Sequence, residues 1–127
     1  MDDTLTEKVI GAAFRVHNEL GFGFLESVYE KALAIELYSA GVSFQTQAPI
    51  KVFYQSQIVG EFVCDILIDE QLIVELKSVS KISTTHEVQL VNYLTATKID
   101  IGLLINFGPS KVDVKRKYKN AKESSGE

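Results

Sequence analysis

In the first third of the chain, apolar residues recur at the spacing of an amphipathic helix. One face of the first stretch carries, in order, Leu5, Val9, Ala12, Val16 and Leu20. Residues 4–7 (Thr-Leu-Thr-Glu) have the pattern of a capping box, and residues 21–23 (Gly-Phe-Gly) end the helix. A second helix is predicted from about residue 25 to residue 40, with Gly41 at its C-terminal cap.

From residue 42 the pattern changes to short segments in which apolar and polar residues alternate. Pro49 and Gly60 interrupt these segments, and polar residues separate them. Such alternation is typical of half-buried strands. We expect strands near residues 43–48, 50–55, 58–68 and 72–78, arranged as an antiparallel meander.

The last third of the chain combines a helix with two strands. Residues 84–87 (Thr-Thr-His-Glu) form a second capping-box pattern, which predicts a helix to about residue 97. Residues 101–107 are almost continuously apolar, as expected of a strand covered on both faces. Residues 108–109 (Gly-Pro) form a turn before a predicted edge strand at residues 112–114. The predicted order is ααββββαββ, an α+β fold of the α/β-sandwich type with a mixed sheet.

The length and composition of the chain are those of one globular domain. Its 127 residues can bury a core, and we place the domain at residues 1–120. We expect residues 121–127 to be disordered. No apolar run approaches the length of a membrane span, and the N-terminus lacks the character of a signal peptide. The single cysteine, Cys64, excludes an internal disulfide and suits the reducing cytoplasm, so we expect a cytoplasmic protein without membrane contact.

Charge is distributed unevenly along the chain, whose net charge is −4. Between Lys111 and Lys122, six basic residues accompany one acidic residue, so this segment carries +5 and the remainder carries −9. A basic segment of this kind can contact phosphate backbones. It can equally be a solvated edge strand followed by a frayed terminus.

Charged residues also occur where apolar residues are expected, in the two strands predicted between residues 58 and 78. Asp65 lies in the first of these strands, and Glu75 and Lys77 lie in the second. Acidic and basic side chains are rare in strands and are seldom buried unless they are paired or bind a metal. A carboxylate on each strand with a lysine nearby indicates a divalent-metal site for phosphodiester chemistry.

Side-chain alternation places Glu75 and Lys77 on one face of their strand. Asp65 stands beside Glu75 only if paired residues have an even sum of residue numbers, which requires a three-residue connection at residues 69–71 or a bulge. A two-residue turn would instead place Asp65 beside Val74. The metal-site hypothesis therefore makes a geometric demand, because Asp65 and Glu75 must face the same side of the sheet.

If the two carboxylates converge, their oxygens can bind Mg²⁺, or Mn²⁺ as a substitute, because both ions prefer hard oxygen ligands. The backbone carbonyl of Leu76 is a natural additional ligand. Lys77 would orient or deprotonate the attacking water and help to neutralise charge at the scissile phosphate. The alternative is that Lys77 forms an ordinary ion pair with Asp65 or Glu75 on a solvated sheet face.

Two helical features are compatible with a cleft beside these strands. His86, Gln89 and Tyr93 form a polar stripe on one predicted helix. The stripe can line an active cleft, and it can equally be a surface stripe with a half-buried tyrosine. Glu26 and Tyr29 are neighbours in the second helix, where Glu26 is also well placed to interact with the helix dipole.

Several short sequence blocks occur in an order that is specific. They are residues 17–21 (His-Asn-Glu-Leu-Gly), 23–29 (Gly-Phe-Leu-Glu-Ser-Val-Tyr), Asp65, residues 75–77 (Glu-Leu-Lys), 89–94 (Gln-Leu-Val-Asn-Tyr-Leu) and 102–108 (Gly-Leu-Leu-Ile-Asn-Phe-Gly). The second block resembles the signature of the GxxExxY proteins, a branch of the PD-(D/E)XK nuclease superfamily. The similarity extends over about residues 5–117. A single Glu-x-Lys is weak evidence, whereas several blocks in the right order are strong evidence.

The resemblance implies a restriction-endonuclease-like core, with a central mixed sheet flanked by helices in the order αβββαβ. It implies catalytic roles for Glu26, Asp65, Glu75, Lys77, Gln89 and Tyr93. Asp65, Glu75 and the Leu76 carbonyl would bind the metal, with Glu26 contributing through water. Cys64 stands where the superfamily name has a proline, a residue that is often missing in the superfamily.

The implied function is that of a Mg²⁺-dependent nuclease that hydrolyses phosphodiester bonds of nucleic acid, with DNA as the expected substrate. The alternative is a non-catalytic module that retains the nuclease fold and binds nucleic acid or protein. Specific interfaces with DNA commonly bury about 1,000 Å² or more of protein surface, which is much for a chain of this size. We therefore also expect a homodimer, with residues 102–107 or the first helix as its interface.

Overall fold

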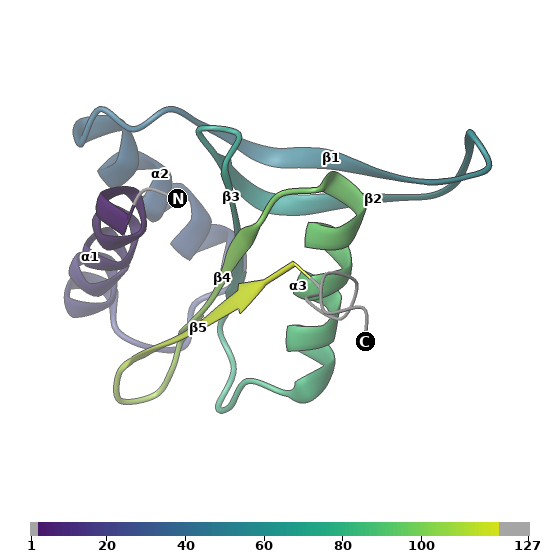
Figure 1. Cartoon of the computed structure of the whole chain (residues 1–127). Helices are drawn as coiled ribbons and strands as arrows, with labels where there is room; N and C mark the ends of the chain where they lie inside the picture. Colours follow the sequence, from purple (N-terminus) through teal and green to yellow (C-terminus); the bar gives the residue numbers. More distant parts are fainter. Residues whose placement is uncertain (1–2, 120–127) are drawn as a thin grey trace.

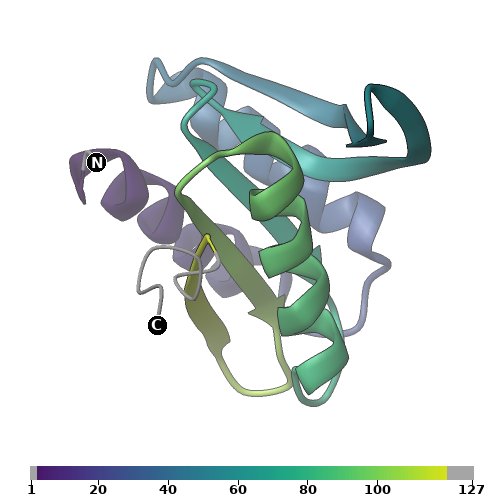
Figure 2. The same ribbon diagram turned by 45° about the vertical axis from the view of Figure 1, so that its right-hand side comes forward.

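The computed structural model describes residues 3–119, which form a five-stranded mixed sheet with helices on both faces (Figures 1 and 2). The elements are, in chain order, α1 (Asp3–Leu20), α2 (Glu26–Ser39), β1 (Phe44–Tyr54), β2 (Gln57–Ile68), β3 (Leu72–Lys77), α3 (Thr84–Thr97), β4 (Ile101–Phe107) and β5 (Val112–Tyr118). The strands lie in this same order across the sheet, and β3 and β4 are parallel while the other neighbours are antiparallel. The predicted α+β class with a mixed sheet is confirmed.

Each face of the sheet buries its own apolar core. The larger core joins α1 and α2 to one face and includes Val74 of β3. The smaller core joins α3 to the other face and includes Ile73. This division follows from the alternation of side chains along β3. Glu75 and Lys77 have the parity of Ile73, so they belong to the face on which α3 lies.

The first two helices match the predicted ones, with a difference at the start. α1 begins at Asp3, so Thr4 lies inside the helix and the capping box predicted at residues 4–7 is wrong. Leu25 is the N-cap of α2 and makes no side-chain hydrogen bond there. Gly41 follows α2 with a φ of 73°, a left-handed conformation that favours glycine, which confirms the predicted end of this helix.

The strands predicted at residues 43–48 and 50–55 are one continuous strand, β1, so the predicted order contains one strand too many. Pro49 does not divide the strand. It pairs with Val63 of β2, and β1 is an edge strand, where a missing N–H donor is tolerated. β1 and β2 form a long hairpin whose outer part, residues 50–62, extends away from the sheet (Figure 1). We call residues 50–62 the arm.

The second half of the chain corrects two predictions and confirms one. The capping box of α3 uses Ser83 and His86 and therefore lies one residue before the predicted one. All seven residues of β4 are buried, as predicted for a strand covered on both faces. For the same reason residues 102–107 cannot form a dimer interface, and that expectation is wrong. β5 is an edge strand, as predicted, but it extends to Tyr118.

No helix within residues 3–119 is long and apolar enough to cross a membrane. The segment predicted to be disordered, residues 121–127, lies outside the described residues.

Candidate active site

The register between β2 and β3 meets the geometric demand made by the sequence. Ile66 pairs with Val74 and Ile68 pairs with Leu72, so the connection has three residues, 69–71. This is the register that the metal-site hypothesis required, and it sets Asp65 opposite Glu75. The ladder between the two strands ends at Ile66, and the rest of β2 continues only with β1.

Asp65 and Glu75 bridge the two strands at the point where this ladder ends. The backbone N–H of Asp65 donates a hydrogen bond to Glu75 Oε2 over 2.8 Å. In return, the backbone N–H of Leu76 donates to Asp65 Oδ2 over 2.7 Å. Each carboxylate thus uses one oxygen to hold the opposite strand. These reciprocal bonds bring the two side chains together and fix their orientation.

Burial raises the pKa of both carboxyl groups. The pKa of Glu75 rises to about 8, first because of burial and then because of the charge of Asp65; Glu26 adds to the rise. The pKa of Asp65 is also raised by burial, although the Leu76 N–H, Lys77 and Gln47 oppose the rise. The charged forms of both carboxyl groups are therefore disfavoured and not fully compensated in the metal-free protein. A divalent cation would supply the missing positive charge, and hard carboxylate oxygens are suitable ligands for it.

Lys77 is half-buried beside the carboxylates and favours the charged form of both. Among residues 3–119, however, no ion pair joins Lys77 to Asp65 or Glu75. The ordinary ion pair considered as the alternative from sequence is therefore not formed. The lysine lies close enough to act on the site electrostatically, and its amine is not engaged by either carboxylate.

Glu26, the first residue of α2, approaches the site from the opposite side of the sheet from α3. It is exposed and shares a hollow with Ser78, whose hydroxyl donates to the Phe24 carbonyl over 2.9 Å. Tyr29 has a structural part in this arrangement. Its buried ring stacks on Phe107 at 4.3 Å, and its hydroxyl donates to the Gly21 carbonyl. Tyr29 thereby anchors the loop that precedes Glu26.

α3 contributes Gln89 and Tyr93 on the other side of the site. The Gln89 amide donates to the Tyr93 hydroxyl over 2.7 Å. Tyr93 belongs to the same buried core as Cys64, the neighbour of Asp65, and its pKa is raised by burial and then by the charge of Glu75. His86, which shares their stripe in the sequence, is instead turned toward the N-cap of α3, where its Nδ1 accepts from the Ser83 N–H.

Two further residues of the site escaped the sequence analysis. Gln47 lies opposite Asp65 in the β1–β2 register, and its amide donates to Glu30 Oε1 over 2.7 Å. A hydrogen bond from Gln47 also lowers the pKa of Asp65, while burial and Asp65 raise the pKa of Glu30. Glu30 could have been found, because it follows Glu26 by one helical turn. No local signal identifies Gln47.

The backbone explains how Gln47 reaches this position. Gln47 has a φ of 51°, which is rare for a residue other than glycine. Strict alternation would place Cys64 and Ile66 in the same core, yet they belong to different cores. The faces of β1 and β2 therefore switch at the level of Gln47 and Asp65. This switch turns both side chains toward the end of β3.

The described residues do not contain a group of three or more histidine, cysteine, aspartate or glutamate side chains that could hold a metal ion. Asp65 and Glu75 would therefore offer a cation two side-chain ligands at most. The Leu76 carbonyl and water would have to complete the coordination, which is common for Mg²⁺. The roles predicted for the six site residues stay predictions.

The mixed sheet between helices, with paired carboxylates where two strands separate, defines a restriction-endonuclease-like fold. A model of the PD-(D/E)XK nuclease superfamily matches residues 3–117, and the chain belongs to this superfamily. The crystal structure of SSO0001 superposes with a TM-score of 0.60 at 16% sequence identity, which supports the fold alone. The match covers 78% of this chain and 52% of that one, so this chain spans about half the length of its structural relative. A search of curated proteins gave no significant match.

Proposed function

We propose that the chain is a Mg²⁺-dependent nuclease that hydrolyses phosphodiester bonds, with DNA as its substrate. The observation that carries this proposal is the Asp65–Glu75 pair, in which the buried Glu75 and the half-buried Asp65 are held together and the pKa of Glu75 is raised to about 8. Nucleases of the superfamily generally use divalent metals. The signature at residues 23–29 supports placement in the GxxExxY branch.

The proposed metal ligands are Asp65, Glu75 and the Leu76 carbonyl, with Glu26 acting through water. Mn²⁺ would substitute for Mg²⁺ because both ions prefer oxygen ligands. When bound, the cation would polarise a phosphoryl oxygen and lower the pKa of water. The backbone N–H groups of Asp65 and Leu76 would keep the two carboxylates in a fixed orientation toward it.

The remaining side chains would act on the water and the phosphate. Lys77 would orient or deprotonate the attacking water and offset negative charge at the scissile phosphate. Gln89 and Tyr93, joined by their hydrogen bond, would face the phosphate from α3 and donate hydrogen bonds to it. Nucleophile and phosphate would then lie between β3 and α3.

Metal binding and cleavage test this proposal directly. Calorimetry should detect Mn²⁺ binding, and the protein should cleave single- or double-stranded DNA in Mg²⁺. Asp65→Asn removes the carboxylate charge and should abolish cleavage. Because asparagine retains an acceptor for the Leu76 N–H, the chain should stay folded. Asp69→Asn, an exposed carboxylate in the adjacent turn, is the matched control and should remain active. A protein that binds no Mn²⁺ and leaves DNA and RNA intact would refute the nuclease and favour the non-catalytic module.

We also propose a homodimer, with α1 as the remaining candidate for the interface after β4 is excluded. Phe14 on α1 is 45% exposed, which provides an apolar contact point. Sedimentation at micromolar concentration should give twice the chain mass. A strictly monomeric mass would refute the dimer without affecting the proposed chemistry.

A further inference from the structure

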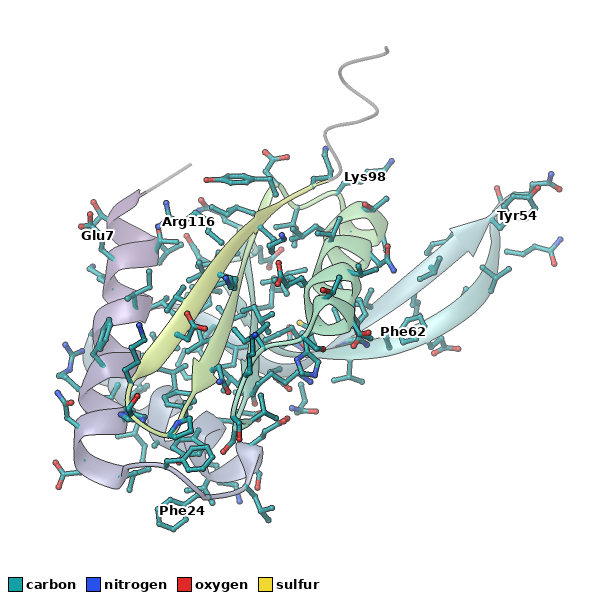
Figure 3. All side chains as sticks on the ribbon, turned by 90° about the horizontal axis from the view of Figure 1, so that it is seen from below. Glu7, Phe24, Tyr54, Phe62, Lys98 and Arg116 are labelled. Atoms are coloured by element: carbon teal, nitrogen blue, oxygen red, sulfur yellow. The ribbon has the colours of Figure 1, made fainter. Side chains whose placement is uncertain are left out.

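A groove of about 710 Å³ lies between α3 and the arm, next to the candidate active site. Phe62, labelled in Figure 3, lies in the hairpin beside α3. Phe53 and Val52 line the groove from β1, and Val88 lines it from α3. Its size is that of a site for a small organic ligand.

The walls of the groove expose aromatic and apolar surface. Phe53 is 59% exposed and Phe62 is 44% exposed. The Phe62 ring lies 5.8 Å from the Tyr93 ring and is tilted by 42° to it. Tyr93 itself is buried, so Phe53 and Phe62 supply the exposed aromatic surface that a flat apolar group could cover. Offset and tilted aromatic contacts of this kind are favourable.

The polar groups of the groove are neutral apart from one cation. Gln89 and Asn92 present side-chain amides, and Thr85 and Thr95 present hydroxyl groups. Among the described residues that line the groove, Lys98 bears the only charge. In a chain with a net charge of −4, a groove lined by no described carboxylate favours an anionic partner. Aromatic faces, amides and a cation together match a nucleotide with an unpaired base.

The groove is continuous with the candidate active site. Gln89 and Tyr93 line the groove, and Tyr93 shares a buried core with Cys64, the neighbour of Asp65, and with Ile73, which has the same parity on β3 as Glu75. A nucleic-acid strand whose phosphate lies at Asp65 and Glu75 would therefore place a neighbouring base near Phe62. A base inside a duplex is stacked on both faces and cannot enter such a groove without being unstacked.

We propose that this groove binds an unpaired base of single-stranded DNA beside the scissile phosphate. This inference rests on the proposed function for the position of the phosphate. It makes the substrate a single strand, or a duplex with an unpaired segment, rather than intact double-stranded DNA.

The test uses a single-stranded oligodeoxynucleotide containing 2-aminopurine, titrated with the full chain in EDTA so that no cleavage occurs. Stacking on the aromatic rings should quench the fluorescence. Phe62→Leu keeps an apolar side chain but removes the ring, and should weaken binding roughly ten- to hundredfold. Phe62→Trp should restore binding. Tyr38→Ala, which removes an exposed aromatic residue of α2 outside the groove, should leave binding unchanged.

Four results would overturn the inference. They are equal affinity for a duplex of the same sequence, unchanged affinity of Phe62→Leu, preferential binding of the corresponding RNA, and conversion of a dimer into a monomer by Phe53→Asp. The last result would show that a second copy of the chain occupies the groove.

Failure of the inference and failure of the proposed function give different results. Cleavage of duplex DNA at the same rate by the wild type and Phe62→Leu would refute the base-binding groove and leave the nuclease standing. Quenching of 2-aminopurine by a protein that takes up no Mn²⁺ would refute the nuclease and leave the groove standing.

Discussion

Glu75 is buried beside Asp65, and this position disfavours its charged form in the metal-free protein. Its pKa rises from 4.5 to about 8, first because of burial and second because of Asp65. In the unfolded chain the carboxyl group titrates near 4.5. Between these values the folded state binds more protons than the unfolded state, so the free energy of unfolding falls as pH rises. The raised pKa values of Asp65 and Glu30 act in the same direction.

We predict that the metal-free protein loses stability between pH 4.5 and about pH 8, and that Glu75→Gln removes most of this loss. Glutamine keeps an acceptor oxygen for the Asp65 N–H and carries no charge. At pH 8 the variant should have a Tm higher than the wild type by about 4 °C or more. Thermal unfolding in EDTA measures this, with Glu61→Gln, an exposed carboxylate of β2, as control. A wild-type Tm that rises over this pH range would contradict the prediction.

Gln47 is the residue whose side chain organises the carboxylates on the side of α2. Because its amide bonds Glu30 and also Asp65, its loss would leave the two carboxyl groups without a shared donor. We predict that Gln47→Ala lowers Mn²⁺ affinity about 10- to 100-fold, the usual scale for partners of metal ligands. Calorimetry compares it with Gln45→Ala, an exposed glutamine of the same strand. Equal Mn²⁺ affinities for the two variants would show that Gln47 does not position Asp65.

At the level of single residues, sequence reasoning succeeded where a rule of geometry applied. The period of two along a strand was enough to state that Asp65 lies opposite Glu75 only with a three-residue connection or a bulge, and the structure has the three-residue connection. The same rule could not find Gln47, because the residue has a positive φ and the alternation of β1 changes there. Such a break depends on how the whole hairpin is twisted over the sheet, which no local pattern encodes.

The elements are positioned for the site mainly by the packing of α3 on the sheet. Gly102 in β4 lies directly beneath Leu90 of α3. A Cβ atom at this glycine would lie 2.8 Å from Leu90 Cδ1 and 3.2 Å from the Ile73 carbonyl oxygen. The absence of a side chain at Gly102 therefore allows the close approach that brings Gln89 and Tyr93 toward Glu75.

We predict that Gly102→Ala destabilises the protein by about 1–3 kcal/mol, since an extra methyl group must displace Leu90 or the backbone. Gly11→Ala is the control: its Cβ would lie 3.6 Å from the end of the Arg15 side chain, and alanine favours the interior of α1. It should be stabilising by up to about 1 kcal/mol. Chemical denaturation measures both. Equal stability of Gly102→Ala and the wild type would show that α3 shifts without cost.

At the level of elements, the sequence predicted the helices and most strands but not every boundary. Residues 101–107 were recognisable because a strand buried on both faces needs almost only apolar residues. The prediction of two strands around Pro49 was wrong, because a proline usually interrupts a strand but is tolerated in an edge strand such as β1. The capping box of α3 was displaced by one residue because Ser83 and His86 can form the same reciprocal bonds as Thr and Glu.

Over the whole molecule, the basic segment near the C-terminus has less free charge than the sequence implies. Lys117 pairs with Glu87 over 3.0 Å, and Lys119 pairs with Asp100 over 3.5 Å. The segment also forms β5, which lies at the opposite edge of the sheet from β1. A single strand of DNA bound between the arm and α3 would therefore contact Lys98 before it reached β5. Of the two interpretations of the basic segment, the ion pairs and the position of β5 favour a solvated edge strand over contact with phosphate.

We predict that Lys98, rather than the exposed Lys115 of β5, neutralises a phosphate of the bound single strand. Each phosphate neutralised on a single strand contributes about −0.7 to the slope of log K against log salt. Lys98→Gln should thus make the slope less steep by about 0.7, whereas Lys115→Gln should leave it unchanged. Fluorescence titrations at several salt concentrations give both slopes. A change with Lys115→Gln alone would place the strand on β5, and its bases could then not reach Phe62, because β5 and the arm lie at opposite edges of the sheet.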